Sequence, residues 1–489
     1  MPTTKSTVQS PLKTYLAACQ CVEREETNLP LRLTAGEIPD ALRGTFFGNG
    51  PGRLQHQGVT YQHLFDGDGM VTKVRFENGQ ALYTNRYVRT REFTEEEAKG
   101  KMLYRSFGTN IPGGIRNNLL KMRFKNAANT SVIHHGGKLL ALWEGGLPHL
   151  LDPETLATLD RYDYGGVLQN DFSWLDKQIM PELPFSAHPK EHPGTGVLHN
   201  FGTLSGTEQR LVTYEVDPQG KAKIAATYPL PDMTFVHDFV LTQEEHQIYF
   251  LTPVSFNLLP AFLGKITPVD SISSTGKQTR IMVVHHGEVD YYETDPCFIF
   301  HFVNGYQAAD GSLVVDGLRM DGFPTGLATE NMTEVAAENE NSGVLHRYRI
   351  NTQTGQVRRE PLSEYFMELP SIHPNWQGKA YRYAWSIGGD PKQNTSLLHG
   401  VAKVDTEAKT TQYLNLYPHL PGEPLFVPRP DGTTEDDGWL LTMVFNADEV
   451  INKLLIINAA DLAIVGELTL PHAQPIGFHG TWVNENAMR

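Results

Sequence analysis

A short unit recurs along this chain and limits what it can fold into: a β-strand, a turn built on Asp or Asn, and a second strand. The turn residues of five copies are Asp152, Asp217, Asn351, Asp405 and Asn458. They are 65, 134, 54 and 53 residues apart, so the second interval is close to a double step. Repeats of this length with one hairpin each are typical of β-propeller blades. Single hairpins of this kind also occur in other β-rich proteins.

The apolar segments of the chain have the character of strands. They are short, β-branched or aromatic, and bounded by Gly, Pro, Asn or Asp. Examples are Val71–Phe76, Lys138–Trp143, Leu211–Val216, Gln247–Leu251, Leu313–Asp316, Leu440–Phe445 and Lys453–Asn458. Helical periodicity is weak and limited to Lys13–Glu26 and Thr94–Arg105. We therefore expect an all-β propeller, with surplus residues forming a cap of loops and helices over one end.

Composition narrows the classes of partner and compartment. The chain has 489 residues, 40% of them hydrophobic, and a net charge of -15. That charge disfavours nucleic acid, whose phosphates would repel it. The three cysteines, with no secretory pattern and no apolar stretch of bilayer length, indicate a cytoplasmic protein. The polar, Ser/Thr-rich residues 1–13 predict a disordered tail before a single propeller domain over 14–489.

Four histidines stand out by their surroundings, because each lies in an apolar or strand-like segment with no cysteine nearby. They are His188, His237, His301 and His479. A propeller would bring such distant residues together, since the innermost strand of each blade faces the central axis. Neutral imidazole suits iron, zinc, copper or nickel and does not suit calcium or magnesium. A lone histidine on an apolar strand is also explained as an ordinary core residue, and the chain has 19 histidines.

Isolated acidic residues within apolar segments strengthen the metal hypothesis. Metal-bound imidazole usually donates its second N–H to a carboxylate or carbonyl group. Glu144, Glu368 and Glu423 have the expected setting. A buried, unpaired carboxylate is costly, so each needs a partner. An exposed turn for Glu423 and a solvent contact for Glu144 are the simpler explanations of each residue alone.

Further motifs, ordered from Ile38 to Trp482, carry a family resemblance. They are Arg43-Gly44-Thr45, Asn49-Gly50-Pro51-Gly52, Phe65-Asp66-Gly67-Asp68-Gly69-Met70, Arg86-Tyr87-Val88-Arg89-Thr90, Asn126-Ala127-Ala128-Asn129-Thr130, Glu423-Pro424 and Phe426-Val427-Pro428-Arg429. Each glycine-rich motif alone reads equally well as a turn. Taken together with the histidine segments, the ordered set resembles the carotenoid cleavage oxygenases, most closely the cyanobacterial apocarotenoid oxygenases.

The resemblance implies a fold, a cofactor and an activity. The fold is a seven-bladed propeller. The implied ligands of Fe(II) are His188, His237, His301 and His479, supported by Glu144, Glu368 and Glu423. In the family a threonine methyl group crowds one vacant iron position, and Thr130 matches it. The implied reaction is cleavage of a conjugated C=C bond of an apocarotenal or apocarotenol by O2, giving two carbonyl products, one of them retinal or a similar aldehyde.

Aromatic residues flank the predicted ligands. They are Phe65, Trp143, Phe235 and Phe300, and they predict an apolar tunnel for a flat polyene, or else an ordinary core. In the related stilbene-cleaving oxygenases, a lysine before the equivalent glutamate serves the substrate's phenol. Trp143 stands there in this chain, which favours a carotenoid-type substrate over a stilbene.

Two apolar segments, 256–264 and 119–124, predict an exposed patch for peripheral membrane contact, or a buried loop of the cap. The sequence is also compatible with other functions. Within the family these are stilbene cleavage by a dioxygenase and non-oxidative isomerohydrolysis. A third alternative, from another functional class, is a propeller that binds or carries carotenoid without cleaving it. A calcium-dependent propeller hydrolase is disfavoured, because calcium needs clustered oxygen ligands.

Overall fold

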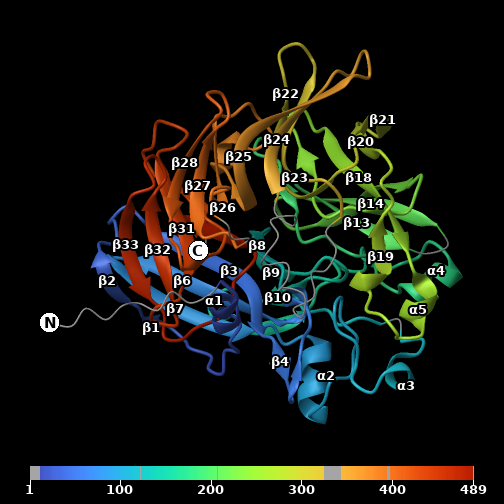
Figure 1. The fold of residues 1–489 in the computed structure, drawn as a ribbon, viewed down its shortest axis with the longest axis horizontal. Helices are drawn as coiled ribbons and strands as arrows, with labels where there is room; N and C mark the ends of the chain where they lie inside the picture. The colour runs from blue at the N-terminus through green and yellow to red at the C-terminus, as the bar shows by residue number, and fades with distance from the viewer. Residues whose placement is uncertain (1–10, 122, 206–207, 324–342, 394–396, 488–489) are drawn as a thin grey trace.

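The computed structural model describes residues 11–121, 123–205, 208–323, 343–393 and 397–487. Within these residues the sheets follow one another around a common centre and form a seven-bladed β-propeller (Figure 1). Six larger sheets make the seven blades, because one seven-stranded sheet supplies two of them. Its long strand β25 (Val357–Ser371) pairs with β24 through one part and with β26 through another. The predicted fold class is confirmed.

We number the blades in chain order. Blade 1 contains β1 (Leu29–Pro30), β3 (Gly44–Arg53), β6 (Asp68–Glu77), β7 (Gln80–Tyr87) and β34 (Gly480–Asn484). Blade 2 contains β8 (Ser131–His135), β9 (Lys138–Leu142), β10 (His149–Leu151) and β11 (Thr158–Arg161). Blade 3 contains β12 (Lys190–Glu191), β13 (Leu198–Ser205), β14 (Gln209–Val216) and β15 (Ala222–Pro229).

The other blades continue the ring. Blade 4 contains β16 (Thr234–Phe235), β17 (Val240–Leu241), β18 (Gln247–Phe256), β19 (Ile272–Ser274), β20 (Thr279–His285) and β21 (Glu288–Thr294). Blade 5 contains β22 (Phe298–Gln307), β23 (Leu313–Met320), β24 (Gly343–Ile350) and the start of β25. Blade 6 contains the end of β25, β26 (Tyr383–Gly389), β27 (Gly400–Asp405) and β28 (Thr410–Asn415). Blade 7 contains β29 (Leu420–Pro421), β30 (Leu425–Pro428), β31 (Gly438–Asn446), β32 (Ile451–Asn458), β33 (Ile464–Thr469) and β2 (Arg32–Gly36).

Both ends of the chain close the ring. The C-terminal β34 pairs with β3 in blade 1, with Gly44 opposite Asn484. The N-terminal β2 pairs with β33 in blade 7, with Arg32 opposite Thr469. Closure of this kind leaves no open seam between the first and last blades.

The blades pack face to face, so both faces of their inner and middle strands, such as β3 and β18, are buried. On β3, Phe46 belongs to a core cluster with Trp439 of blade 7, while its neighbour Phe47 belongs to one with Val132 of blade 2. Successive strand residues point to opposite faces, which explains this division. The near-continuous apolar character of the strands follows from burial on both faces.

The recurring Asp or Asn turns are confirmed as the outer hairpins of five blades. They join β10–β11, β14–β15, β24–β25, β27–β28 and β32–β33. In each, the side-chain oxygen accepts backbone N–H groups, as Asp217 Oδ1 does from Gln219 and Lys221. The double interval arises in blade 4, whose β20–β21 turn uses His286 and Gly287 at positive φ of 50° and 85°. A turn of this type needs no Asp or Asn cap.

Helices are few in the described residues and shorter than the sequence indicated. They are α1 (Pro11–Ala18), α2 (Arg91–Lys99), α3 (Ile115–Asn118), α4 (Trp174–Ile179) and α5 (Leu258–Phe262). The helix expected over Thr94–Arg105 begins earlier, because Thr90 caps it, and ends at Gly100, which is left-handed with φ of 59°. The helix expected over Lys13–Glu26 begins at Pro11 and ends at Ala18. Residues 1–10 of the expected tail lie outside the described residues, and the division into a tail over 1–13 and one domain over 14–489 stays a prediction.

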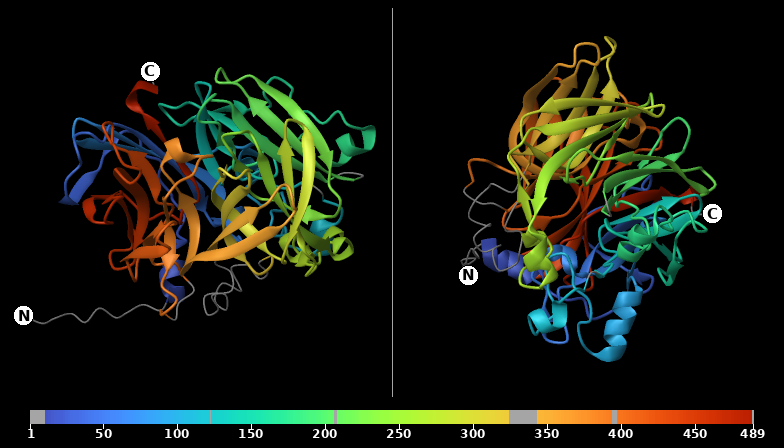
Figure 2. Two further views of the ribbon diagram at one scale, coloured as in Figure 1. Left: turned by 90° about the horizontal axis from the view of Figure 1, so that it is seen from above. Right: turned by 90° about the vertical axis from the view of Figure 1, so that its right-hand side faces the viewer.

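The cap lies on one side of the molecule, where α2, α3 and α5 are grouped (Figures 1 and 2). The backbone N–H of Leu120, after α3, donates to the carbonyl of Phe262 in α5 at 3.0 Å. This bond joins two segments that are far apart in sequence. No helix in the described part of the chain is long and apolar enough to cross a membrane.

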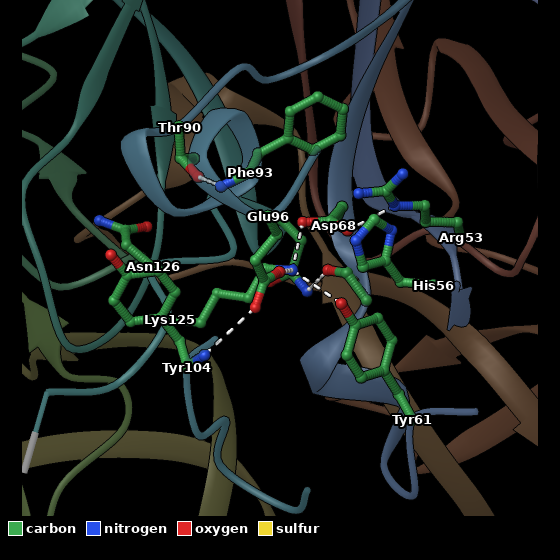
Figure 3. A network of polar contacts seen from close by, with 12 residues as sticks. Arg53, His56, Tyr61, Asp68, Thr90, Phe93, Glu96, Tyr104, Lys125 and Asn126 are labelled. Carbon is green, nitrogen blue, oxygen red and sulfur yellow. Dashed lines mark hydrogen bonds and ion pairs between the residues drawn. The ribbon is translucent and has the colours of Figure 1, made fainter. Parts of the chain in front are cut away.

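A buried network of charges holds the cap segment to blade 1 (Figure 3). The Nζ of Lys125, whose side chain is fully buried, lies 2.7 Å from Asp68 Oδ1 and 2.8 Å from Glu96 Oε2. It also donates to the Tyr61 hydroxyl at 2.7 Å. Arg53 Nε binds the other oxygen of Asp68 at 2.6 Å. Burial alone would lower the pKa of Lys125, but Asp68, Tyr61 and Glu96 raise it above its ordinary value, so the lysine stays charged.

Replacing Lys125 by alanine should destabilise the protein strongly. The change would leave Glu96 buried without a cation and Asp68 with Arg53 alone, and an uncompensated buried charge typically costs about 3–5 kcal/mol of the free energy of unfolding. Chemical denaturation measures this loss. The exposed Lys121 is the matched control, and Lys121→Ala should change stability by less than about 0.5 kcal/mol. A loss for Lys125→Ala as small as that of the control would show that the network contributes little.

Candidate metal centre

Four blades each bring one imidazole to the centre. His188 lies two residues before β12, His237 between β16 and β17, His301 within β22, and His479 immediately before β34. These positions belong to blades 3, 4, 5 and 1. The innermost strand of each blade therefore positions its histidine, and the four predicted residues converge although up to 291 residues separate them.

The imidazoles are in mutual contact. The ring centroid of His188 lies 4.4 Å from that of His237, 5.1 Å from that of His301 and 4.7 Å from that of His479. One ring nitrogen each of His188, His237 and His301 lies within 4.8 Å of the others, close enough to share one metal ion. His479 joins them through its Nε2, which is 3.1 Å from the Nε2 of His301.

Three carboxylates contact the outer nitrogens of three of these rings. His479 Nδ1 lies 2.9 Å from Glu423 Oε1, and His301 Nδ1 contacts Glu368 Oε2. His237 Nδ1 is farther from Glu144 Oε2, at 3.3 Å. The pairing expected from the sequence is thus present for all three acidic residues. Glu368 and Glu423 are mostly buried, whereas Glu144 is 27% exposed because it lines a cavity.

All seven blades contribute to this centre. The histidines come from blades 1, 3, 4 and 5. Glu144 follows β9 of blade 2, Glu368 lies in the blade 6 part of β25, and Glu423 lies between β29 and β30 of blade 7. The backbone fixes the carboxylates further, because the N–H of Leu369 donates to Glu368 and that of Gly480 to Glu423.

The donor set fits a cation. When Nδ1 of His301 and of His479 donates to its carboxylate, both Nε2 atoms carry lone pairs that face each other at 3.1 Å. Two acceptors at that distance repel unless positive charge lies between them. The Nε2 of His188 is buried with no hydrogen-bond partner among the described residues. Among the described residues, no Lys or Arg nitrogen lies within 4.0 Å of a carboxylate oxygen of Glu144, Glu368 or Glu423.

Burial favours the uncharged forms of the site. It lowers the pKa of His188 and of His301 well below the ordinary value, and neighbouring imidazoles lower both further. Burial likewise raises the pKa of Glu368 to about 7. Burial alone would lower the pKa of His237, but the neighbouring Glu144 raises this pKa above its ordinary value. Neutral imidazole is the form that binds a metal ion.

The five residues expected to contact substrate take different places. The ring of Phe300 packs edge-on to that of His237, with the ring centroids 5.0 Å apart. The ring of Phe65 packs against that of Phe300, with the centroids 6.4 Å apart. Phe235 lines the cavity beside Glu144. The backbone carbonyl of Thr130 accepts the N–H of His479 at 3.2 Å. Trp143 lies half-buried, where Gly145 and Gly146 leave room for its ring.

A cavity of about 370 Å³ reaches Glu144, the carboxylate that contacts His237. Its lining is mainly apolar and includes Phe107, Phe124, Phe235, Phe256 and Phe262. Glu144 and Val236, the neighbour of His237, also line it. Sequence reasoning did not single out Arg105, Thr203 or Thr234, which contribute polar groups to the wall. No local pattern marks these three, because their common location depends on how the blades and the cap pack.

Comparison with known proteins agrees with this geometry. The family model of the retinal pigment epithelial membrane protein matches residues 19–484. The chain is 33% identical to apocarotenoid-15,15'-oxygenase of Synechocystis sp., over 91% of each chain. It is 29% identical to isoeugenol monooxygenase of Pseudomonas nitroreducens, over 94% of this chain and 97% of that one.

Solved structures give the same assignment. A crystal structure of the cobalt-substituted Synechocystis enzyme superposes with a TM-score of 0.90 and 32% identity, covering 97% of this chain and 99% of that one. The chain therefore belongs to the family of the retinal pigment epithelial membrane protein and the carotenoid cleavage oxygenases, and it is an oxygenase of that family.

Proposed function

We propose that this protein is a non-heme Fe(II) dioxygenase that cleaves a conjugated C=C bond of an apocarotenal or apocarotenol. The observation that carries the proposal is the set of four imidazoles, two of whose Nε2 atoms face each other at 3.1 Å. All-nitrogen donors suit iron, and four of them leave positions open on an ion that takes six ligands. Similarity to an apocarotenoid oxygenase supports the choice of substrate.

In this proposal His188, His237, His301 and His479 hold the iron, and Glu144, Glu368 and Glu423 orient three of the imidazoles. Bound Fe(II) would supply the binding and activation of O2. The chain itself holds the polyene in the apolar cavity, excludes water with Phe65 and Phe300, and aligns one double bond with the centre. One oxygen atom goes to each carbon of the broken bond, so two carbonyl products form and one would be retinal or a similar aldehyde.

Two other reactions of the family are distinguishable. A phenolic substrate, as the name of the isoeugenol relative indicates for that protein, or a hydroxystilbene would need a polar partner for its phenol, and Trp143 provides no cation beside Glu144. A non-oxidative isomerohydrolase would consume no O2.

The direct test supplies 18O2 to the iron-loaded protein with a panel of apocarotenals, a hydroxystilbene and isoeugenol. We expect cleavage of an apocarotenal with one labelled oxygen in each product, detected by mass spectrometry after rapid reduction of the aldehydes. Turnover of the phenolic substrates alone would assign the protein to the other branch. Products formed without O2 uptake would refute oxidative cleavage.

Replacing His237 by alanine should remove iron and turnover together, because the remaining three imidazoles no longer enclose the ion. Iron content by mass spectrometry measures the first effect. His346, in β24, is the control, since among the described residues its ring has one hydrogen bond, to the carbonyl of Val344. His346→Ala should keep iron and activity. Normal iron content in His237→Ala would show that the ion binds elsewhere.

We also propose that the cap contacts a membrane surface through an apolar patch. Ile115, Leu119, Leu120, Leu258 and Leu259 are 44–70% exposed, and α5 both carries part of the patch and lines the cavity. Residue 122 of the predicted segment lies outside the described residues. A substrate that dissolves in lipid would thus leave the bilayer beside the cavity. The local Lys121 and Arg123 would favour lipid head groups despite the overall negative charge.

The double substitution Leu120→Glu/Leu259→Glu should weaken binding to phosphatidylcholine vesicles by roughly two to four orders of magnitude, since each leucine contributes about 1.5–3 kcal/mol when fully buried. Vesicle co-sedimentation measures this. Leu159 on β11 is 58% exposed and serves as the control, because Leu159→Glu should change nothing. Equal binding by the wild type and both variants would exclude this patch as the contact.

A further inference from the structure

Arg105 is a buried cation without an anionic partner. Its side chain is among the largest fully buried ones, and the residue is 2% exposed. Among the described residues no carboxylate lies within 4.0 Å of its guanidinium, in contrast to Arg53 and Arg347, which each bind a buried aspartate. Burial lowers the pKa of Arg105, and no neighbouring charge counteracts it. An arginine nevertheless stays protonated in proteins, so the positive charge is uncompensated.

The hydrogen bonds of Arg105 leave part of its donor capacity unused. Nε donates to Asn110 Oδ1 at 2.9 Å, one terminal nitrogen to the carbonyl of Ala261 at 2.8 Å, and the other to that of Ile266 at 3.2 Å. All three acceptors are neutral. Because a guanidinium has five N–H groups, two of them have no bond within the described residues.

The same guanidinium side chain lines the cavity beside the imidazoles. It lies next to α5, the helix that separates the cavity from the exposed patch, whereas Glu144 lines the cavity next to His237. The hydroxyls of Thr203 and Thr234 also line the cavity, and both are buried without a partner in the described structure. The mainly apolar cavity wall thus contains, besides Glu144 and a few neutral polar side chains, a cation with no carboxylate within 4.0 Å and two hydroxyls without a hydrogen-bond partner in the described structure.

We infer that Arg105 binds the polar end group of the substrate, and that this end group carries an acceptor oxygen, as a carboxylate or an aldehyde does. The inference rests on the proposed apocarotenoid cleavage and specifies the substrate within that class. Arginine offers only donors, so it favours a carboxylate most, a carbonyl oxygen next, a hydroxyl group less, and a methyl group not at all. The end group lies on the α5 side of the cavity, and the polyene extends from there toward the histidines.

A purely structural role makes a different prediction. Arg105 links the cap segment to α5 through the carbonyls of Ala261 and Ile266, and a link of this kind contributes to stability alone. Its loss would weaken the binding of all ligands of one length by a similar factor. Preference among end groups therefore separates the two roles.

The test uses apocarotenoids of one chain length that end in a carboxylate, an aldehyde, a hydroxyl group or a methyl group. Dissociation constants are measured on the metal-free protein by quenching of tryptophan fluorescence. We expect the wild type to bind the carboxylate roughly 10- to 100-fold more tightly than the methyl-terminated ligand, as for other hydrogen bonds to charged groups. The aldehyde should lie between them.

Three variants complete the design. Arg105→Gln keeps a donor for one carbonyl but removes the charge, and it should reduce the carboxylate-to-methyl ratio to near one. Arg105→Lys should retain a preference for the carboxylate. Arg349→Gln, at a half-exposed arginine of β24 that binds Asp310, is the control and should keep the wild-type ratio.

The outcomes also separate this inference from the proposed function. A wild type without end-group preference, or an unchanged ratio in Arg105→Gln, would overturn the role of Arg105 even if apocarotenals are cleaved. A wild type that binds the series with the expected ratio but cleaves none of it when loaded with iron would contradict the proposed reaction and leave the binding role standing. If Arg105→Gln does not fold, the carboxylate-to-methyl ratios of the wild type and of Arg105→Lys still test the role of Arg105.

Discussion

The candidate centre depends on the orientation of imidazoles by carboxylates. A carboxylate at Nδ1 of His301 and another at Nδ1 of His479 fix which nitrogen carries the proton, and the two Nε2 atoms then face each other as acceptors. Without positive charge between them this arrangement is unfavourable. The same carboxylates accept the backbone N–H groups of Leu369 in β25 and Gly480 in β34, so strand residues help to fix the geometry. The protein therefore maintains a site whose energy is lowered by a cation.

The propeller explains why such a site can be built from distant residues. Each blade contributes one side chain to the centre, as an imidazole or as the carboxylate that orients one. Ring closure by β34 and β2 then matters to chemistry as well as to stability, since His479 directly precedes β34. The buried charges around Lys125 hold the cap on this scaffold, and the cap in turn forms much of the cavity wall.

Much of the fold was predictable because its signals are local. The Asx turns at Asp152 or Asp405 are encoded by the residues that form them, and the missing copy in blade 4 reflects the exchange of such a turn for His286-Gly287. Histidines in apolar segments and isolated glutamates were visible for the same reason. Helix ends were predicted poorly. The expected range of α2 came from a weak helical periodicity, whereas the capping residues Thr90 and Gly100 determine where the helix begins and ends.

The cavity and its polar wall were not predictable from the sequence. Lys125 meets Asp68 and Glu96 across 57 and 29 residues, and Arg105 meets Ala261 across 156, so no window of sequence contains both partners. Their environment is created only when the cap packs on the blades. A charged residue such as Arg105 has the same appearance in sequence whether it is solvated or buried.

The most direct test of the account is an anomalous difference map from crystals of the iron-loaded protein, measured on both sides of the iron absorption edge. The account predicts a single strong peak among the Nε2 atoms of His188, His237, His301 and His479. A peak at another place, or crystals of active protein with no iron signal between these imidazoles, would contradict it.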